Sequence, residues 1–429
     1  MKIAGPRISR WRKGAANLLA FAARPVRRAQ GRGGTVVEAY RGYGTSQEIF
    51  LIGRVFRQSH PDVDASPDNV RGNLRDIARR IRRRSVKDAV ITARFAGAQT
   101  RVPTDRDGYF RIHLRPRDVR DSKTPWHSVE LALETDPPVS ARGQVYIPPQ
   151  SCRLVVVSDI DDTIMRTGVA NKLKMLWRLF VASAESRVAF PGAAALCRAF
   201  HAGASGDEAN PMIYVSRAPW GIYDMLDAFF RRHDIPVGPV LFLREWGLSW
   251  RHPLPRRAEQ HKRELISHIL TLYHGLPFVL IGDSGQHDPE VYAEIVAAHP
   301  GRVRAVYIRN VSRDAGRVGE IERLAAAVAA AGSSLVLAAD SAAMARHAAG
   351  LDLIASDGEE AVLAERAAAN IGGAAAEPYQ VGGPTPFATS QKLAEGELRS
   401  TLMQKPGAPP TIVVEPVHRD GPRSPPSAR

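Results

Sequence analysis

VVVSDIDDTIMRTGV, residues 155–169, joins a run of valines to three carboxylates within four positions. The valines at 155–157 predict a strand buried on both faces, as the strands of parallel sheets are. Asp159, Asp161 and Asp162 then fall at its carboxyl end, where the ligand crevice of an open α/β sheet lies. Carboxylates this dense repel one another unless a cation neutralises them, and hard oxygen ligands suit Mg2+ rather than Zn2+. The stretch predicts a parallel α/β sheet with a cation site. The alternatives are an acidic loop or a purely structural cation site.

Length and composition narrow the class of protein. A chain of 429 residues exceeds the usual size of one domain, so we expect two domains and tails. Two cysteines, Cys152 and Cys197, argue against a disulfide framework and fit a reducing compartment. No apolar run reaches 18 residues, so no transmembrane helix is expected. The formal charge of +15 favours a polyanionic partner, which is nucleic acid, an anionic membrane surface or a phosphorylated substrate.

Residues 1–34 carry nine basic residues, and no acid precedes Glu38. This composition predicts a basic N-terminal arm that is either disordered or forms an interfacial helix on anionic lipid. An export signal is a third interpretation, because residues 15–23 are a short apolar stretch after a basic start.

Residues 35–149 have the texture of a β domain. Short apolar or alternating runs are separated by turn signals, which predicts a small antiparallel β-sandwich-like domain. The runs lie at residues 49–56, 89–95, 109–114, 129–133 and 144–147.

One insertion interrupts this β pattern. Over residues 71–87, Leu74, Ile77, Ala78 and Ile81 recur at helical spacing among eight basic residues, which predicts a basic amphipathic helix. Its basic face is either simply solvated or contacts the phosphates of lipid or nucleic acid. No aromatic residues interleave with the basic ones, so a base-stacking surface is not indicated and we expect no nucleic-acid partner.

From residue 150 to 358 strand and helix patterns alternate, which predicts βαβ units and a parallel sheet with helices on both faces. Residues 359–429 are rich in Ala, Gly, Pro, Ser and charge and predict a mostly disordered tail, although residues 411–414 are a short apolar run. The predicted strands are 154–157, 212–215, 240–243, 278–281, 303–308 and 335–339, and the predicted helices are 223–232, 261–273, 289–298 and 321–330.

Several later residues have the chemistry that phosphoryl transfer needs, which is positioning, charge neutralisation and a proton donor. Ser216 ends the second predicted strand, and its hydroxyl is suited to a phosphoryl oxygen, as is the fork of Arg217. Lys262 opens a predicted helix from which a lysine can offset the negative charge of a nucleophile, and the choice of Lys262 over Arg263 rests on family resemblance. The alternatives are a serine that caps the next helix and a lysine that is solvated.

A second acidic site follows the fourth predicted strand of this region, in FVLIGDSGQHD at residues 278–288. Gly282 permits a tight exit from the strand, Asp283 occupies its carboxyl end, and Asp288 follows a turn. Two strand-end carboxylate sites that meet in one crevice can share a magnesium ion, which keeps waters and substrate phosphate as further ligands.

The pattern Asp159-x-Asp161-x-Thr163 after an apolar strand resembles the first motif of the haloacid dehalogenase-like (HAD-like) phosphotransferases, whose fold is a Rossmann-type parallel sheet. A longer set of motifs resembles the actin-patch-associated phosphatidate phosphatase family, over residues 150–312 and more loosely in the preceding β domain. These motifs are SDIDDTI at 158–164, YVSRAPW at 214–220, LREWG at 243–247, HK at 261–262, LIGDSGQHDP at 280–289 and VRAVYIRNV at 303–311.

The resemblance implies Mg2+-dependent hydrolysis of phosphatidate to diacylglycerol and phosphate through an aspartyl phosphate on Asp159. It implies that Asp161 acts as the general acid and then as the general base, and that Thr163 orients the first loop. The implied phosphoryl-binding residues are Ser216 and Lys262, and Arg217 is a further candidate because of its own charge. The implied metal ligands are Asp159, Asp283 and the backbone carbonyl of Asp161, while Asp162 and Asp288 are supporting acids and Asp288 is a further candidate ligand. The family often has Ser-x-Ser-Pro-Trp where this chain has SRAPW at residues 216–220, and this difference bears on substrate preference.

The motif spacing leaves no room for a large cap domain, which favours a bulky or membrane-embedded substrate. The apolar and basic residues at 172–180 predict either a segment that enters a membrane interface or an ordinary core-facing helix. We therefore expect a cytoplasmic, peripherally membrane-associated phosphatidate phosphatase. The alternatives are a phosphatase for a soluble or nucleic-acid phosphomonoester and a non-catalytic scaffold that binds anionic membranes.

Overall fold

The computed structural model describes residues 29–30, 34–57, 84–119, 124–160, 163–164, 190–217, 220, 223–243, 258–312, 315–371, 398–403 and 411–416. The predicted basic arm up to residue 28, residues 71–83 of the predicted basic helix and the stretch at 172–180 lie outside these described residues. Contacts divide the chain into two compact units. The first comprises residues 1–153, 170–188 and 201–256, and the second comprises 154–169, 189–200 and 257–429.

The first unit contains a ten-stranded sheet that is antiparallel except where β10 runs parallel to β3. The order is β1-β2-β4-β3-β10-β9-β6-β7, and β5 and β8 also pair with β4. The strands are β1 (Ala29–Gln30), β2 (Thr35–Ala39), β3 (Arg41–Gly44), β4 (Ile49–Arg57), β5 (Arg84–Ser85), β6 (Val90–Phe95), β7 (Ala98–Pro103), β8 (Tyr109–Leu114), β9 (Trp126–Leu133) and β10 (Val139–Tyr146).

This sheet differs in two ways from what the sequence predicts. The runs expected to form a sandwich of two sheets form one connected sheet, because β4 is hydrogen-bonded along both edges, to β2 and β3 on one side and to β8 on the other. The predicted basic helix does not reach residue 87, because Arg84 and Ser85 form β5 and pair with Arg57 and Phe56 of β4.

Alternation of buried and exposed side chains explains the core of this sheet. In β9, Val129, Leu131 and Leu133 are buried while the residues between them face outward. The turn before β8 depends on Gly108, which has φ +78° and whose added Cβ would lie 2.3 Å from the Val55 carbonyl oxygen.

The rest of the first unit is a βαβ unit, in which β12 (Met212–Ser216) and β13 (Val240–Phe242) run parallel with α5 (Tyr223–Arg232) between them in the sequence. Helix α5 packs against β3 and against Tyr40, the residue that precedes this strand. Tyr40 lies 4.6 Å from the Tyr223 ring, and the buried Arg41 guanidinium donates hydrogen bonds to the Tyr223 hydroxyl and the Asp227 carboxylate.

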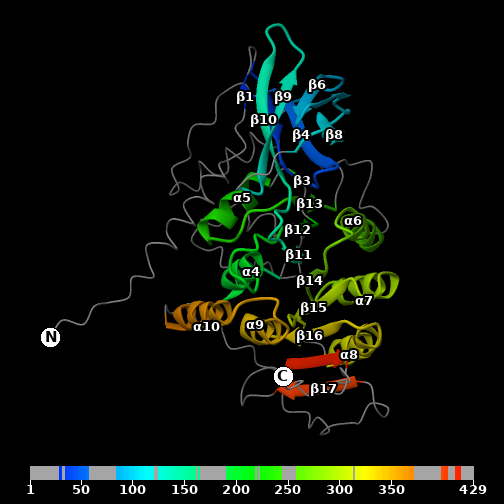
Figure 1. Ribbon diagram of the computed structural model, residues 1–429, viewed down its shortest axis with the longest axis vertical. Coiled ribbons are helices and arrows are strands. Elements are labelled where there is room, and N and C mark those ends of the chain that lie inside the picture. The colour runs from blue at the N-terminus through cyan, green and yellow to red at the C-terminus, as the bar shows by residue number, and fades with distance from the viewer. Residues whose placement is uncertain are drawn as a thin grey trace, which may run out of the picture. The chain divides into compact units, whose positions relative to one another are not determined.

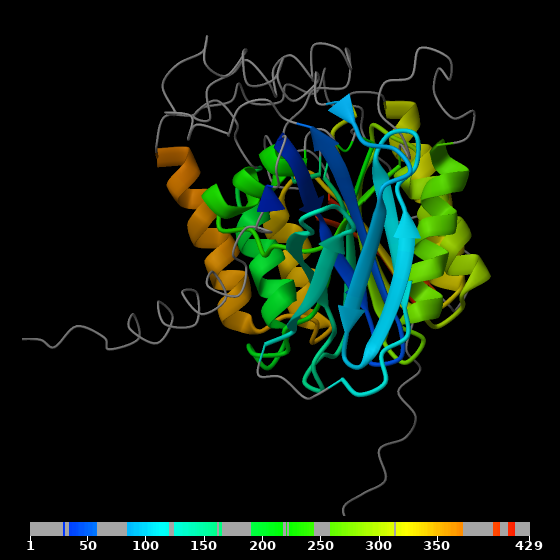
Figure 2. The ribbon, with the colours of Figure 1, turned by 90° about the horizontal axis from the view of Figure 1, so that it is seen from above.

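The second unit contains four parallel strands in the order β11-β14-β15-β16, extended by the antiparallel β18 and β17. Helices α6, α7 and α8 lie on one side of this sheet and α4, α9 and α10 on the other (Figures 1 and 2). The strands are β11 (Val155–Asp159), β14 (Phe278–Asp283), β15 (Val303–Arg309), β16 (Ser334–Ala338), β17 (Leu398–Met403) and β18 (Thr411–Pro416), and the helices are α4 (Ala193–Ala202), α6 (Ala258–Leu272), α7 (Asp288–Ala298), α8 (Ala315–Ala330), α9 (Ser341–Gly350) and α10 (Ser356–Ile371).

The α/β class and the parallel sheet are therefore confirmed, whereas the HAD-like assignment and the domain boundaries stay predictions. Three further helices, α4, α9 and α10, are not among those named from the sequence. Within the region expected to be a mostly disordered tail, α10 continues to Ile371 and β18 covers the edge of β16 with three buried apolar side chains, Ile412, Val413 and Val414. None of the helices in the described parts of the chain has the length and apolar character needed to cross a membrane.

Replacing Arg41 by Met should destabilise the first unit by about 1–3 kcal/mol, because the buried hydrogen bonds of the guanidinium to Tyr223 and Asp227 are lost while Asp227 keeps its ion pair with Arg231. The matched control is Arg101→Met, since Arg101 pairs with Glu134 on an exposed surface and its loss should cost far less. Urea unfolding followed by circular dichroism measures both changes, and equal shifts of the two midpoints would contradict this account.

Candidate active site

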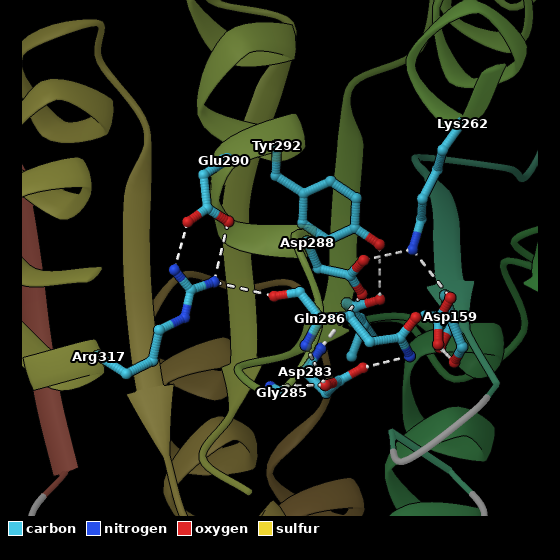
Figure 3. A network of polar contacts seen from close by, with 11 residues as sticks. Asp159, Lys262, Asp283, Gly285, Gln286, Asp288, Glu290, Tyr292 and Arg317 are labelled. Carbon is cyan, nitrogen blue, oxygen red and sulfur yellow. Dashed lines mark hydrogen bonds and ion pairs between the residues drawn. The ribbon is translucent and has the colours of Figure 1, made fainter. Parts of the chain in front are cut away.

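Four charged side chains meet at the carboxyl ends of two neighbouring parallel strands (Figure 3). Asp159 is the last residue of β11 and Asp283 the last residue of β14, and the two strands are paired in register. Asp288 opens α7, and Lys262 lies in the second turn of α6. All four residues are fully buried. The structure thus brings together four residues that the sequence analysis singled out, although their chemical roles stay predictions.

Lys262 connects two of the carboxylates. Its Nζ donates to Asp159 Oδ1 at 2.8 Å and to Asp288 Oδ1 at 2.6 Å. Burial by itself lowers the pKa of this ammonium, but the Asp159 and Asp288 carboxylates outweigh it, so the pKa of Lys262 lies well above its ordinary value. The ammonium is therefore charged across the physiological pH range.

Tyr292 of α7 contacts the ammonium of Lys262 with its ring. Its ring centroid lies 5.4 Å from Lys262 Nζ, within the range of a cation–π contact, and its hydroxyl donates to the Ile281 carbonyl at 3.0 Å. Burial raises the pKa of this phenol well above its ordinary value, so Tyr292 remains a neutral donor that joins α7 to β14.

The Asp283 carboxylate is oriented by the loop that follows it. Its Oδ1 accepts the amide hydrogens of Gly285 at 2.8 Å and Gln286 at 3.0 Å, and its Oδ2 accepts the Gln286 side-chain amide at 2.9 Å. The Asp283 amide in turn donates to Asp288 Oδ2 at 3.3 Å. These contacts fix the directions in which the two carboxylates present their remaining lone pairs.

The donor set suits a divalent cation. One carboxylate oxygen from each of Asp159, Asp283 and Asp288 lies within 4.8 Å of the others. Mg2+ binds oxygens at about 2.1 Å, so ligands on opposite sides of it are about 4.2 Å apart, and a spacing within 4.8 Å is close to that of the ligands of one ion. Three carboxylates and one ammonium also leave this buried site with a net charge of −2, which a divalent cation neutralises.

The remaining predicted residues are not among these four charged side chains, and two of them lie outside the described residues. The Thr163 carbonyl accepts a hydrogen bond of 2.9 Å from Arg309 Nε at the end of β15. Ser216 is buried at the end of β12 and Arg217 follows it, both in the first unit, so their predicted contacts with a phosphoryl group stay predictions. Asp161 and Asp162 lie outside the described residues.

The sequence analysis missed four residues that support the site, namely Gln286, Tyr292, Arg309 and Arg317. Gln286 lies inside the motif at 280–289, so its proximity to Asp283 was a usable signal. Arg309 lies inside the motif at 303–311, which was a usable signal as well. Arg317 carried no local signal, because it holds backbone carbonyls of a segment distant in sequence.

A parallel α/β sheet that gathers metal-binding carboxylates and a buried lysine at its strand ends is typical of metal-dependent enzymes that handle phosphate groups. Residues 154–310 match the family described as phosphatidate phosphatase APP1, catalytic domain. The match confirms the predicted family resemblance for this segment, which contains Asp159, Lys262, Asp283 and Asp288.

Two relatives from yeasts extend this result. The chain is 30% identical over 165 residues to phosphatidate phosphatase APP1 of Saccharomyces cerevisiae, which is 38% of this chain and 27% of that protein. It is 24% identical over 221 residues to an uncharacterized protein of Schizosaccharomyces pombe, which is 51% of this chain and 35% of that protein. The chain thus spans about a third or less of the length of these curated relatives.

Comparison with solved structures adds no functional argument. A carbohydrate acetylesterase from Xanthomonas citri aligns over 88% of this chain and 90% of its own, with 10% identity and a TM-score of 0.23. A xyloglucanase from Bacteroides ovatus aligns over 69% of this chain and 63% of its own, with 6% identity and a TM-score of 0.15. Similarity this low does not establish a shared fold.

Gly282 should tolerate no side chain, because an added Cβ would lie 2.4 Å from Asp288 Oδ2 and 2.8 Å from the Tyr292 ring. Gly282→Ala should therefore lower the free energy of unfolding by about 1–3 kcal/mol, the usual cost of overpacking, and displace Asp288. Gly275→Ala is the control, since its Cβ would meet no atom within 4 Å. Chemical unfolding measures both variants, and a Gly282→Ala midpoint equal to that of Gly275→Ala would contradict the packing described.

Proposed function

We propose that this protein is a Mg2+-dependent phosphatidate phosphatase that hydrolyses phosphatidate to diacylglycerol and phosphate through an aspartyl-phosphate intermediate. The observation that carries the proposal is the buried group of Asp159, Asp283 and Asp288 beside Lys262, within the segment that matches the phosphatidate phosphatase family. A HAD-like fold of the catalytic region belongs to the same proposal, supported by the parallel strand order and by the acids at the ends of β11 and β14.

In the proposed first step, a carboxylate oxygen of Asp159 attacks the phosphorus atom. A bond between this oxygen and phosphorus forms, and the bond from phosphorus to the glycerol oxygen breaks. The leaving alkoxide takes a proton from Asp161, so that diacylglycerol departs as the neutral alcohol.

In the second step, water attacks the same phosphorus atom while the Asp161 carboxylate takes a proton from it. The bond from phosphorus to Asp159 breaks, which releases phosphate and restores both carboxyl groups to their starting states. One acid thus serves in both directions, once as proton donor and once as proton acceptor.

Lys262 has two roles in this scheme. Its hydrogen bond of 2.8 Å to Asp159 orients the nucleophile, and its positive charge attracts the phosphoryl oxygens. Asp159, Asp283 and Asp288 would hold Mg2+, which when bound neutralises charge on the phosphoryl group. Ser216 and Arg217 are proposed as further phosphoryl-binding residues, and Thr163 as the residue that orients the first loop.

The proposed setting of the reaction is an anionic membrane surface on the cytoplasmic side, with the protein peripherally bound. The net charge of +15 supports this setting, because polybasic proteins are attracted to anionic lipid headgroups. The proposed order along the chain is a basic arm, a β domain over residues 35–149, a catalytic domain over 150–358 and a tail.

The test is phosphate release from phosphatidate in mixed micelles, with Mg2+ or with EDTA. Wild type should release phosphate only with Mg2+, and Asp159→Asn should lower the rate by at least about 10³-fold because the amide is a poor nucleophile. Asp352→Asn is the matched control. Asp352 is exposed with φ +52°, a conformation that Asn also adopts, so its rate should equal that of wild type.

Cleavage of a soluble phosphomonoester with the same dependence on Mg2+ and Asp159, while phosphatidate remains intact, would refute the lipid substrate and retain the chemistry. No phosphate release from either substrate would refute the catalytic proposal and favour a scaffold that binds membranes.

A further inference from the structure

Arg317 of α8 holds the loop that joins β14 to α7, although it lies 29 positions beyond Asp288 in the sequence. Its Nε donates to the Ser284 carbonyl at 3.1 Å. Its Nη2 donates to the Gln286 carbonyl at 2.8 Å (Figure 3). Two backbone carbonyls of this loop, both between Asp283 and Asp288, are therefore bound to one guanidinium.

The guanidinium is itself held in place by Glu290 in the first turn of α7. Nη2 donates to Glu290 Oε2 at 2.9 Å and Nη1 donates to Oε1, so the pair is bidentate. Burial raises the pKa of the Glu290 carboxyl, but the bonds from Arg317 outweigh this and leave that pKa below its ordinary value. The pair is therefore charged at neutral pH, and α8 and α7 together hold the loop.

The same loop carries the donors that orient Asp283. The Ser284 carbonyl and the Gly285 amide belong to one peptide unit, which is planar and rigid. Arg317 binds the carbonyl end of this unit, and Asp283 Oδ1 binds its N–H end at 2.8 Å. Rotating the peptide would break both hydrogen bonds at once.

Gln286 makes the second connection. Arg317 binds the Gln286 carbonyl. The Gln286 amide donates to Asp283 Oδ1 at 3.0 Å, and the Gln286 side-chain nitrogen donates to Asp283 Oδ2 at 2.9 Å. All three hydrogen bonds that these two residues give to the Asp283 carboxylate, two from backbone amides and one from the Gln286 side chain, thus come from residues whose backbone Arg317 holds.

We propose that Arg317 is a positioning residue for the cation site. Arg317 sets the affinity for Mg2+ by fixing the orientation of the Asp283 carboxylate, and it does not touch the ion. The inference rests on the proposed function for the identity of that ion. It depends on the shape of the guanidinium rather than on its charge, because Arg317 uses three separate N–H directions that a lysine ammonium on a flexible stem does not reproduce.

The test is calorimetric titration of the full chain with MgCl2 in the absence of substrate. We expect Arg317→Lys and Arg317→Ala to raise the dissociation constant for Mg2+ by similar factors of about 10- to 100-fold, the usual effect of removing a residue that orients a metal ligand. If only the positive charge mattered, Arg317→Lys would bind Mg2+ as wild type does, and that result would overturn the proposal.

Two control variants isolate the contact. Arg263→Lys makes the same substitution in an exposed ion pair with Glu294, and Glu320→Gln removes the more exposed acid that contacts Arg317 at 3.1 Å. Both should bind Mg2+ as wild type does. Glu290→Gln keeps the arginine but weakens its anchor, so we expect a smaller rise in the dissociation constant than for Arg317→Lys.

Thermal unfolding without Mg2+ distinguishes positioning from general stability. If Arg317→Lys is folded at the titration temperature and still binds Mg2+ weakly, the proposal stands. If Arg317→Lys is unfolded at that temperature, Glu290→Gln is the deciding variant. A dissociation constant of Glu290→Gln for Mg2+ equal to that of wild type would then overturn the proposal.

The titration separates this inference from the proposed function. Tight binding of Mg2+ by wild type, lost in Arg317→Lys, would support the inference even if phosphatidate were not hydrolysed. Wild type that binds Mg2+ no better than Asp283→Asn would overturn it, whatever the phosphatase assay shows.

Discussion

The two ion pairs of the buried Lys262 ammonium, with Asp159 and with Asp288, are the interactions on which the second unit depends. Three carboxylates buried within 4.8 Å of one another repel strongly in a medium of low dielectric constant. The lysine cancels one of these charges, and the remaining net charge of −2 matches the charge of a divalent cation. A site of this kind is stable only where the surrounding chain supplies fixed partners.

The rest of the unit supplies those partners. Parallel pairing of β11 with β14 places Asp159 and Asp283 at the same edge of the sheet. Gly282 leaves the space that Asp288 and Tyr292 fill, and Tyr292 lies beneath Lys262. Backbone amides orient the carboxylate of Asp283. The helices on one side of the sheet therefore serve the site as well as the core, because α6 provides the lysine and α7 provides Asp288.

Much of the fold was predictable because buried parallel strands have continuous apolar runs in their sequence. Residues 278–281 and 303–308 correspond to β14 and β15 almost without change. The prediction failed where the deciding contact is distant. Arg84 and Ser85 form a strand only because β4 offers a free edge, and the residues of β18 gain a partner only because β16 lies at the sheet edge. No pattern within those short segments encodes the neighbour.

The candidate site divides in the same way. The sequence by itself determined that Asp159 and Asp283 follow apolar strands and that Asp288 and Lys262 lie at or near the starts of helices, since each position depends on local pattern and on motifs. Only the tertiary structure decided that one ammonium joins two of these acids, that Tyr292 lies beneath it, and that Arg317 holds the loop of Asp283. The physical reason is that a hydrogen bond between side chains or loops far apart in the sequence depends on angstrom-scale placement of two elements, which neither element's own sequence specifies.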